Sequence, residues 1–201
     1  MCARHRCDRF CECQRASRRS SGFSSKEELA AEAFDYAWNA AWDVRMRDLG
    51  SIANRVDKLK QLIANFVSRR SLVPGGCPLL NTAIDADDGN PILRASALKA
   101  LGVWRAHLVS IVTAGKKRKE IRPGVDPAAF ATMIISSLEG ALMVSRLERD
   151  PRALQAAQAH LEHYIETDVR LQKRYDRAAV KVSTGKSLNS KSTLRNEDQS
   201  L

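Results

Sequence analysis

Apolar residues recur at helical spacing through most of the chain, and no segment alternates apolar and polar residues as a strand would. The first helical stretch follows Ser24 and Ser25, each of which has a glutamate three residues later, as in a capping box. We expect this helix to run to about Leu49, because Gly50 is a natural stop. A second apolar stripe predicts a helix over about 52–70.

Three pairs of a side-chain cap and a proline predict where the remaining long helices begin. Asn and Asp are good N-caps, and proline suits the first helical position because its missing N–H would be unpaired there. The pairs are Asn90-Pro91, Asp126-Pro127 and Asp150-Pro151. We expect the three helices to end near Gly115, Arg149 and Arg177, and a short helix to span about 79–86. The fold class is therefore all-α, with about six helices.

The expected helix over 127–149 is apolar on most of its sides. A helix that is apolar all round must be covered all round, and the core of one chain covers one face only. We therefore expect a homodimer in which this helix and the last helix form a four-helix seam. Burial in the core of a single chain is the alternative. The expected interface residues are Ser137, Gly140, Ala141, Val144, Leu154, Ala157, Leu161 and Tyr164.

The charge of the chain divides it into three parts. The 201 residues carry a net charge of +10, which permits contact with nucleic acid. Most of the excess lies at the two ends, while the middle is nearly balanced. We expect a disordered Arg/Cys-rich segment over 1–22, a helical domain over 23–178 and a disordered basic tail over 179–201. No apolar run suggests a membrane span or a signal peptide, so we expect a cytoplasmic protein.

The cysteines offer two candidate sites. Four of the five lie in the first thirteen residues, and His5, Cys7, Cys11 and Cys13 could supply zinc ligands. They lack a paired Cys-x-x-Cys, which favours an unstructured tail and no metal. Cys77 precedes Pro78, so a helix N-terminus would lower its pKa, as in a sensor thiol; a buried small residue is the favoured interpretation.

Four stretches of the chain resemble a known family. They are Phe23 with Ser24–Leu29, Gly75–Ala83, Asp126-Pro127 and Leu138–Leu142. Together they resemble the effector-binding and dimerisation domain of TetR-type transcriptional regulators, over about residues 23–166. The resemblance implies a homodimer, a small-molecule effector, operator DNA as a partner, and an effector pocket between the helices before the dimer pair. The candidate pocket residues are Trp38, Phe66, Cys77, Trp104, His107 and Met133. For any one of them taken singly, packing in the core is the favoured interpretation.

The segment before Phe23 departs from the family pattern. The DNA-binding unit of the family needs roughly 45 residues, and here 22 residues without an apolar helical stripe precede Phe23. We expect this unit to be lost, or misread through a shifted frame. The leading hypothesis is a ligand-responsive repressor without enzymatic activity or cofactor, since no catalytic constellation is visible. The alternatives are a dimerising ligand-binding protein without specific DNA binding, and a basic protein that holds nucleic acid non-specifically.

Overall fold

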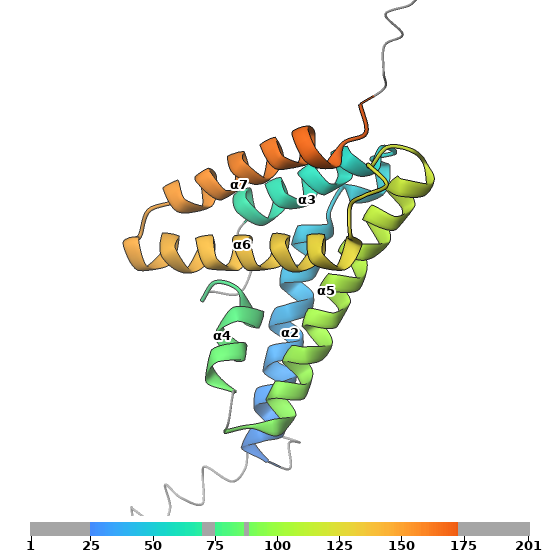
Figure 1. The fold of residues 1–201 in the computed structure, drawn as a ribbon. Helices are drawn as coiled ribbons and strands as arrows, with labels where there is room; N and C mark the ends of the chain where they lie inside the picture. Colours follow the sequence, from blue (N-terminus) through green and yellow to red (C-terminus); the bar gives the residue numbers. More distant parts are fainter. Residues whose placement is uncertain (1–24, 70–74, 87–88, 173–201) are drawn as a thin grey trace, which may run out of the picture. The chain divides into compact units, whose positions relative to one another are not determined.

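The computed structural model describes residues 25–69, 75–86 and 89–172, and within these ranges the fold is all-α. This confirms the predicted fold class (Figure 1). The expected terminal segments 1–22 and 179–201, with His5, Cys7, Cys11 and Cys13, lie outside the described residues. The helices are α2 (Lys26–Met46), α3 (Arg55–Ser68), α4 (Pro78–Asp85), α5 (Pro91–Lys117), α6 (Pro127–Glu148) and α7 (Arg152–Tyr164).

Side-chain caps begin the helices where the sequence predicts them. The side chains of Ser25, Asn90 and Asp126 each accept a hydrogen bond from a backbone N–H two or three residues further on. Asn54 caps α3 in the same way, so this helix begins three residues after the predicted start at Ile52. Each cap satisfies an N–H that has no partner within its own helix.

Two helix ends differ from the prediction. Helix α2 ends at Met46 rather than Leu49, because Asp48 adopts a left-handed conformation with φ of 66° and a 3₁₀ turn follows at Leu49–Ser51. The last helix does not continue to Arg177. Its α-helical part gives way to a π-helical turn, Ile165–Val169, and the chain becomes extended at Arg170.

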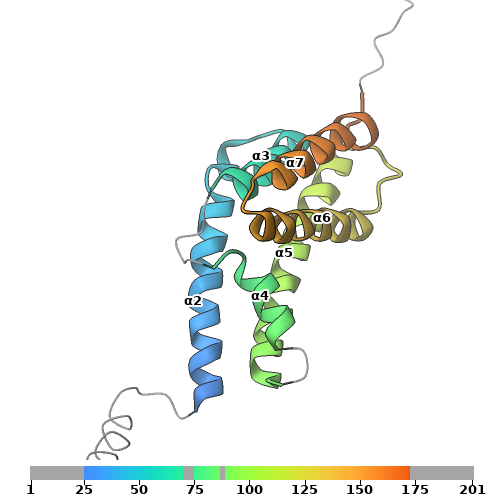
Figure 2. The ribbon, with the colours of Figure 1, turned by 90° about the vertical axis from the view of Figure 1, so that its left-hand side faces the viewer.

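Helix α5 joins two groups of helices: it packs with α2 and α4 on one side, and with α6 and α3, which both contact α7, on the other. Figures 1 and 2 show α2 running beside the long α5, with α6 crossing α5 and α7 lying over α6 and α3. The short helix α4 packs against α5 and α2. The core where these groups meet is closely packed, since its largest side chains are almost fully buried. They include Trp104, Leu59, Leu62, Leu108, Ile134, Leu138 and Leu161.

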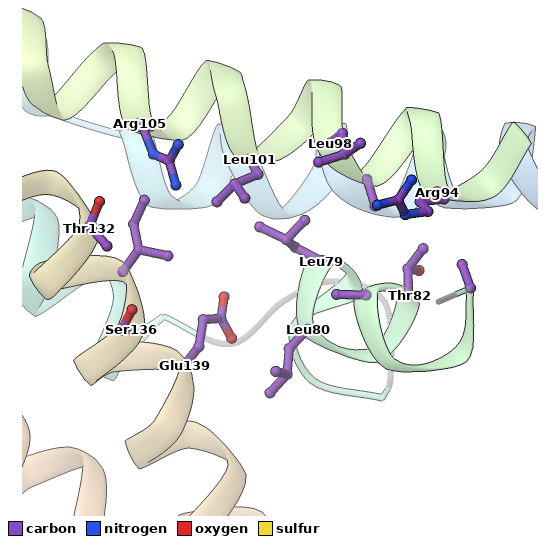
Figure 3. Close-up of a pocket in the computed structure, with 14 residues that line it drawn as sticks. Leu79, Leu80, Thr82, Arg94, Leu98, Leu101, Arg105, Thr132, Ser136 and Glu139 are labelled. Carbon is purple, nitrogen blue, oxygen red and sulfur yellow. The ribbon is translucent and has the colours of Figure 1, made fainter. Parts of the chain in front are cut away.

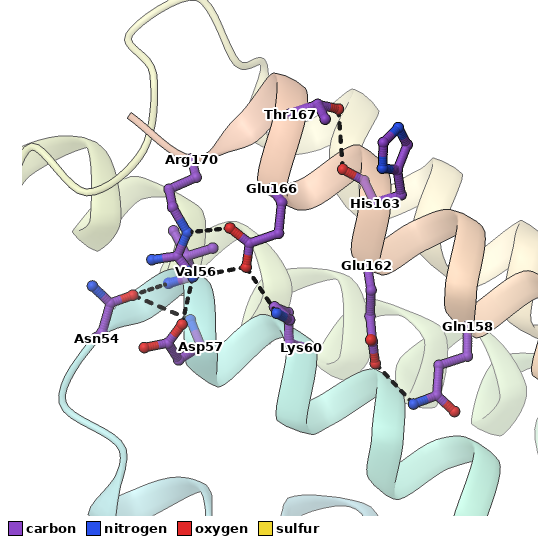
Figure 4. A network of polar contacts seen from close by, with 10 residues as sticks. All are labelled: Asn54, Val56, Asp57, Lys60, Gln158, Glu162, His163, Glu166, Thr167 and Arg170. Atoms are coloured by element: carbon purple, nitrogen blue, oxygen red, sulfur yellow. Dashed lines mark hydrogen bonds and ion pairs between the residues drawn. The ribbon is translucent and has the colours of Figure 1, made fainter. Parts of the chain in front are cut away.

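The end of the last helix is fastened to the start of α3 and to the loop after α5. Arg170 and Ile121 form an isolated antiparallel bridge, and the carboxylate of Glu166 pairs with Lys60 at 2.8 Å (Figure 4). Glu166 also accepts hydrogen bonds from Arg170, which with Lys60 lowers the pKa of Glu166 to about 2. Two backbone hydrogen bonds complete the attachment: the N–H of Arg122 donates to the carbonyl of Val169, and the N–H of Leu171 donates to the carbonyl of Glu120.

We predict that the Gly115→Ala variant loses about 1–3 kcal/mol of folding free energy. A Cβ at this position near the end of α5 would lie 2.5 Å from Cδ1 of the buried Ile121 and 3.1 Å from Cβ of Arg55. Gly102, in the middle of the same helix, is exposed with no neighbour within 4 Å, so Gly102→Ala should stabilise by about 0.5–1 kcal/mol. Urea denaturation of the two variants and the parent measures both changes, and equal effects would contradict the packing argument.

Candidate functional site

An apolar pocket opens between α4, α5 and α6 and has a volume of about 380 Å³ (Figure 3). Two glycines before α4, Gly75 and Gly76, have φ of 117° and 96°, a region that L side chains rarely adopt. They turn the chain so that α4 lies along α5, where Leu79 is buried. The walls are mainly aliphatic, and the lining includes Leu79, Leu80, Ala97, Leu98, Leu101 and Ile135.

Polar groups lie at both ends of this pocket. Arg94 and Arg105 are exposed and lie on α5 with two leucines between them, as Figure 3 shows. Glu139 comes from α6 and is 7% exposed. Its Oε1 accepts a hydrogen bond from the thiol of Cys77 at 2.8 Å, and its Oε2 has no partner among the described residues. Burial raises the pKa of Glu139 above 4.5, against the opposite effects of Cys77 and Arg45.

Arg45 of α2 completes a buried polar cluster with Cys77 and Glu139. The Arg45 side chain is 8% exposed, and its guanidinium lies 4.3 Å from the centre of the Phe66 ring and 5.3 Å from that of Trp104. These two rings are stacked with their centres 5.6 Å apart. The stacked rings stabilise the cation through their negative faces, but Nη1 of Arg45 has no acceptor in the described part of the chain.

The structure separates the six candidate pocket residues, and none of them lines the apolar pocket. Phe66, Trp104 and Cys77 lie in the core beside Arg45. Trp38 and His107 both contact the ring of Trp42, with centres 5.5 and 5.6 Å away. Met133 lines a separate pocket against α7. Four of the six candidate residues belong to the packed core, namely Trp38, Phe66, Cys77 and Trp104.

Sequence reasoning missed the residues that line the pocket. Leu98 and Leu101 line the pocket, and Leu98 is 55% exposed although it is apolar. Glu139 did carry a signal, because it is an acid in a strongly apolar helix. A charged group at such a position is either exposed or held by polar partners, and the structure shows the second case.

Cys77 has the properties of a buried structural residue. It is 1% exposed, and burial is the main reason why the pKa of its thiol is raised. It stands at the N-cap of α4, but its side chain makes no capping bond and donates to Glu139 instead. A thiol with a raised pKa is a poor nucleophile, so these observations favour the buried role over that of a sensor.

The outer face of α6 and α7 carries most of the predicted interface residues. Ser137, Gly140, Ala141 and Val144 are half-buried, and Leu147 is 78% exposed. Leu154, Ala157 and Tyr164 of α7 are also half-buried, whereas Leu161 is buried within the core of the same chain. Helix α6 is long and apolar enough to resemble a membrane span, but it packs on α5 and α7 as a core helix.

Comparison with known proteins places this architecture in a family of regulators. The profile described as "Tetracyclin repressor-like, C-terminal domain" matches residues 55–161. Among solved structures, a TetR transcriptional regulator from Chloroflexus aurantiacus J-10-fl is 40% identical, with a TM-score of 0.71 over 75% of this chain and 77% of that chain. A TetR-family regulator from Cytophaga hutchinsonii is 32% identical, with a TM-score of 0.69 over 75% and 76%.

A more distant likeness concerns the fold alone. A transcriptional regulator from Saccharomonospora viridis, solved in complex with choline, is 19% identical, with a TM-score of 0.62 over 78% of this chain and 84% of that chain. No curated protein sequence matches the chain.

We predict that Glu139→Gln changes how stability depends on pH. A carboxyl group whose pKa is raised by burial stabilises the fold fully only below the ordinary value of 4.5, and this stability is lost as the pH rises through the raised pKa. Glutamine stays neutral and can still accept from Cys77. The free energy of unfolding of the variant should therefore equal that of the parent at acid pH and exceed it near neutrality, by on the order of 1 kcal/mol.

Thermal unfolding between about pH 4 and pH 8, a range that extends from the ordinary carboxyl pKa to above neutrality, measures this difference. Glu148→Gln is the matched control, since Glu148 lies exposed on the same helix. If the two variants follow the parent in parallel across this range, burial does not govern the ionisation of Glu139.

Proposed function

The chain belongs to the TetR family of transcriptional regulators, and we propose that it acts as a dimeric repressor released by a small molecule bound in the apolar pocket. The observation that carries this proposal is the pocket between α4, α5 and α6, with one buried carboxyl group at its inner wall. Pockets for small molecules are typically apolar, with a few polar groups that fix orientation.

The lining favours an effector with an aliphatic or aromatic body and one hydrogen-bonding group. The body would replace water along the leucines of α4 and α5, and the polar group would face Oε2 of Glu139. An unsatisfied buried oxygen is costly, so a ligand that pairs with it gains affinity and orientation together. The Saccharomonospora viridis structure, which holds choline, is consistent with ligand binding in a fold of this kind.

Dimer formation is supported by the composition and exposure of α6. Its outer face presents Met143 and Leu147, which are 44% and 78% exposed, beside the small residues Ser137, Gly140 and Ala141. Small residues let two helices approach closely, and the exposed apolar side chains gain free energy when a second copy covers them. The proposed seam pairs α6 and α7 with the same helices of a second chain.

The DNA-binding part of the proposal is tested with the full chain on its own upstream DNA. Binding that prefers this DNA to a scrambled sequence and survives physiological salt would support operator recognition by this chain, because base contacts add to the salt-dependent phosphate contacts. Fluorescence anisotropy at low and physiological salt measures this preference. Binding that is lost equally on both DNAs would contradict the proposal, and would favour a dimerising ligand-binding protein without specific DNA binding.

A second arm of the same experiment tests the pocket with decanol, an apolar chain with one hydroxyl group. A coupling of about 1–3 kcal/mol would weaken DNA binding roughly 5–150-fold. Thr132→Trp fills the pocket from α6, and should abolish the response to decanol. Thr113→Trp, at an exposed position of α5 outside the lining, is the matched control and should respond like the parent. An identical response in both variants would place the decanol site elsewhere.

We predict that Gly140→Arg converts the dimer into a folded monomer. No atom lies within 4 Å of the Cβ position, so the chain itself has room for the new side chain, which in the seam would bury an unpaired charge. Gly102→Arg, with equal space on α5, should remain dimeric. Light scattering after size exclusion gives the mass, and circular dichroism confirms the fold. A dimeric Gly140→Arg chain would exclude this seam.

A further inference from the structure

A second concave surface, the arginine groove, lies between the ends of α2 and α3 and the corner of α6 and α7. It has a volume of about 640 Å³ and is considerably more polar than the apolar pocket. Four arginines line it, two within α2 and α6 and two at the C-caps of α3 and α6. They are Arg45, Arg69, Arg146 and Arg149.

The positive charge of the groove is only partly balanced. Arg69 pairs with Asp48 at 2.7 Å, and Asp150, the acid in the lining, pairs with Arg152 at 2.6 Å. Arg146 and Arg149 form no ion pair with any residue that the structure describes. The groove therefore concentrates cationic groups, and Asp48 and Asp150 are already engaged in ion pairs. A concave surface of one sign attracts ions of the opposite sign.

The inner wall of the groove contains the unsatisfied guanidinium of Arg45. This side chain is more than nine-tenths buried, lies over the ring of Phe66, which also lines the groove, and has no acceptor at Nη1. Leaving a buried charged donor unpaired is costly, and charge-assisted hydrogen bonds to an oxyanion are among the strongest that a protein forms. An anion in the groove would supply the missing acceptor.

The side chain of Arg146 lies against the backbone of Gly76, before α4. Gly76 has φ of 96°, and the guanidinium of Arg146 lies where a Cβ on this glycine would be, with Nη1 only 2.5 Å away. A side chain at position 76 would therefore both strain the backbone and displace the arginine. Gly76 therefore leaves free the space that the guanidinium of Arg146 occupies at the groove.

We propose that the arginine groove binds a small oxyanion, a carboxylate or a phosphate group, at a site separate from the apolar pocket. Arg45 would pair with it at the inner wall, and Arg146 and Arg149 at the open side. The burial of Arg45 requires a ligand small enough to enter the groove, which favours a low-molecular-weight anion over the backbone of a duplex nucleic acid.

The test is isothermal titration calorimetry of the full chain with inorganic phosphate, and separately with acetate, at constant ionic strength. We expect saturable binding of one anion per chain, weakened about tenfold in Arg146→Gln and in Arg45→Met, since each removes one charge-assisted bond. Tighter binding of phosphate than acetate would identify the phosphate class, and the reverse order the carboxylate class.

Lys99→Gln is the control for a general loss of positive charge, because Lys99 is exposed on α5 outside the groove and should leave the affinity unchanged. Arg146 is exposed, so its replacement tests the groove even if Arg45→Met unfolds the chain. Absence of saturable binding, or equal weakening in Lys99→Gln and Arg146→Gln, would overturn the proposal. Neither DNA nor an effector is present in this measurement, so its outcome is independent of the proposed repressor function.

Discussion

The burial of one cation, Arg45, constrains the whole interior of this protein. Its guanidinium from α2 lies on stacked rings from α3 and α5, and its charge acts on Cys77 before α4 and on Glu139 of α6. Five helices therefore meet at a charged group that is largely buried. Buried charges require partners, so the position of each helix is restricted by what Arg45 needs around it.

The buried polar cluster also connects two concave surfaces of different character, the apolar pocket and the arginine groove. Glu139 lines the apolar pocket and Arg45 lines the arginine groove, with Cys77 bonded to the carboxyl group between them. The apolar pocket and the arginine groove thus each take a buried polar group, Glu139 and Arg45 respectively, from the same polar cluster. A low local dielectric strengthens the interaction across this cluster, so a change of charge on one side alters the groups on the other.

The sequence predicted the helices better than it predicted the site. Capping residues such as Asn90 and Asp126 act within a few residues, so their effect can be recognised without tertiary information. The end of α2 at Asp48 depends on a left-handed backbone conformation, and the π-helical turn lies before a bridge between Arg170 and the distant Ile121. No local pattern contains either feature. For a related reason, the six candidate pocket residues do not line the apolar pocket. A cavity exists where packing leaves space, and the crossing angles of α4, α5 and α6 determine the space of this pocket.

Helix α6 has two faces with different proposed tasks, and its rigidity joins them. Glu139 is buried and lines the apolar pocket, while its neighbour Gly140 is half-buried with no atom near its Cβ position. Adjacent residues of a helix point about 100° apart, so one short segment carries both the effector anchor and part of the dimer seam. In the proposed regulator, a ligand that shifts or rotates α6 at Glu139 must move the seam by a comparable amount. Binding in the pocket would thus change the geometry of the seam directly through α6, with no chain of intervening residues required.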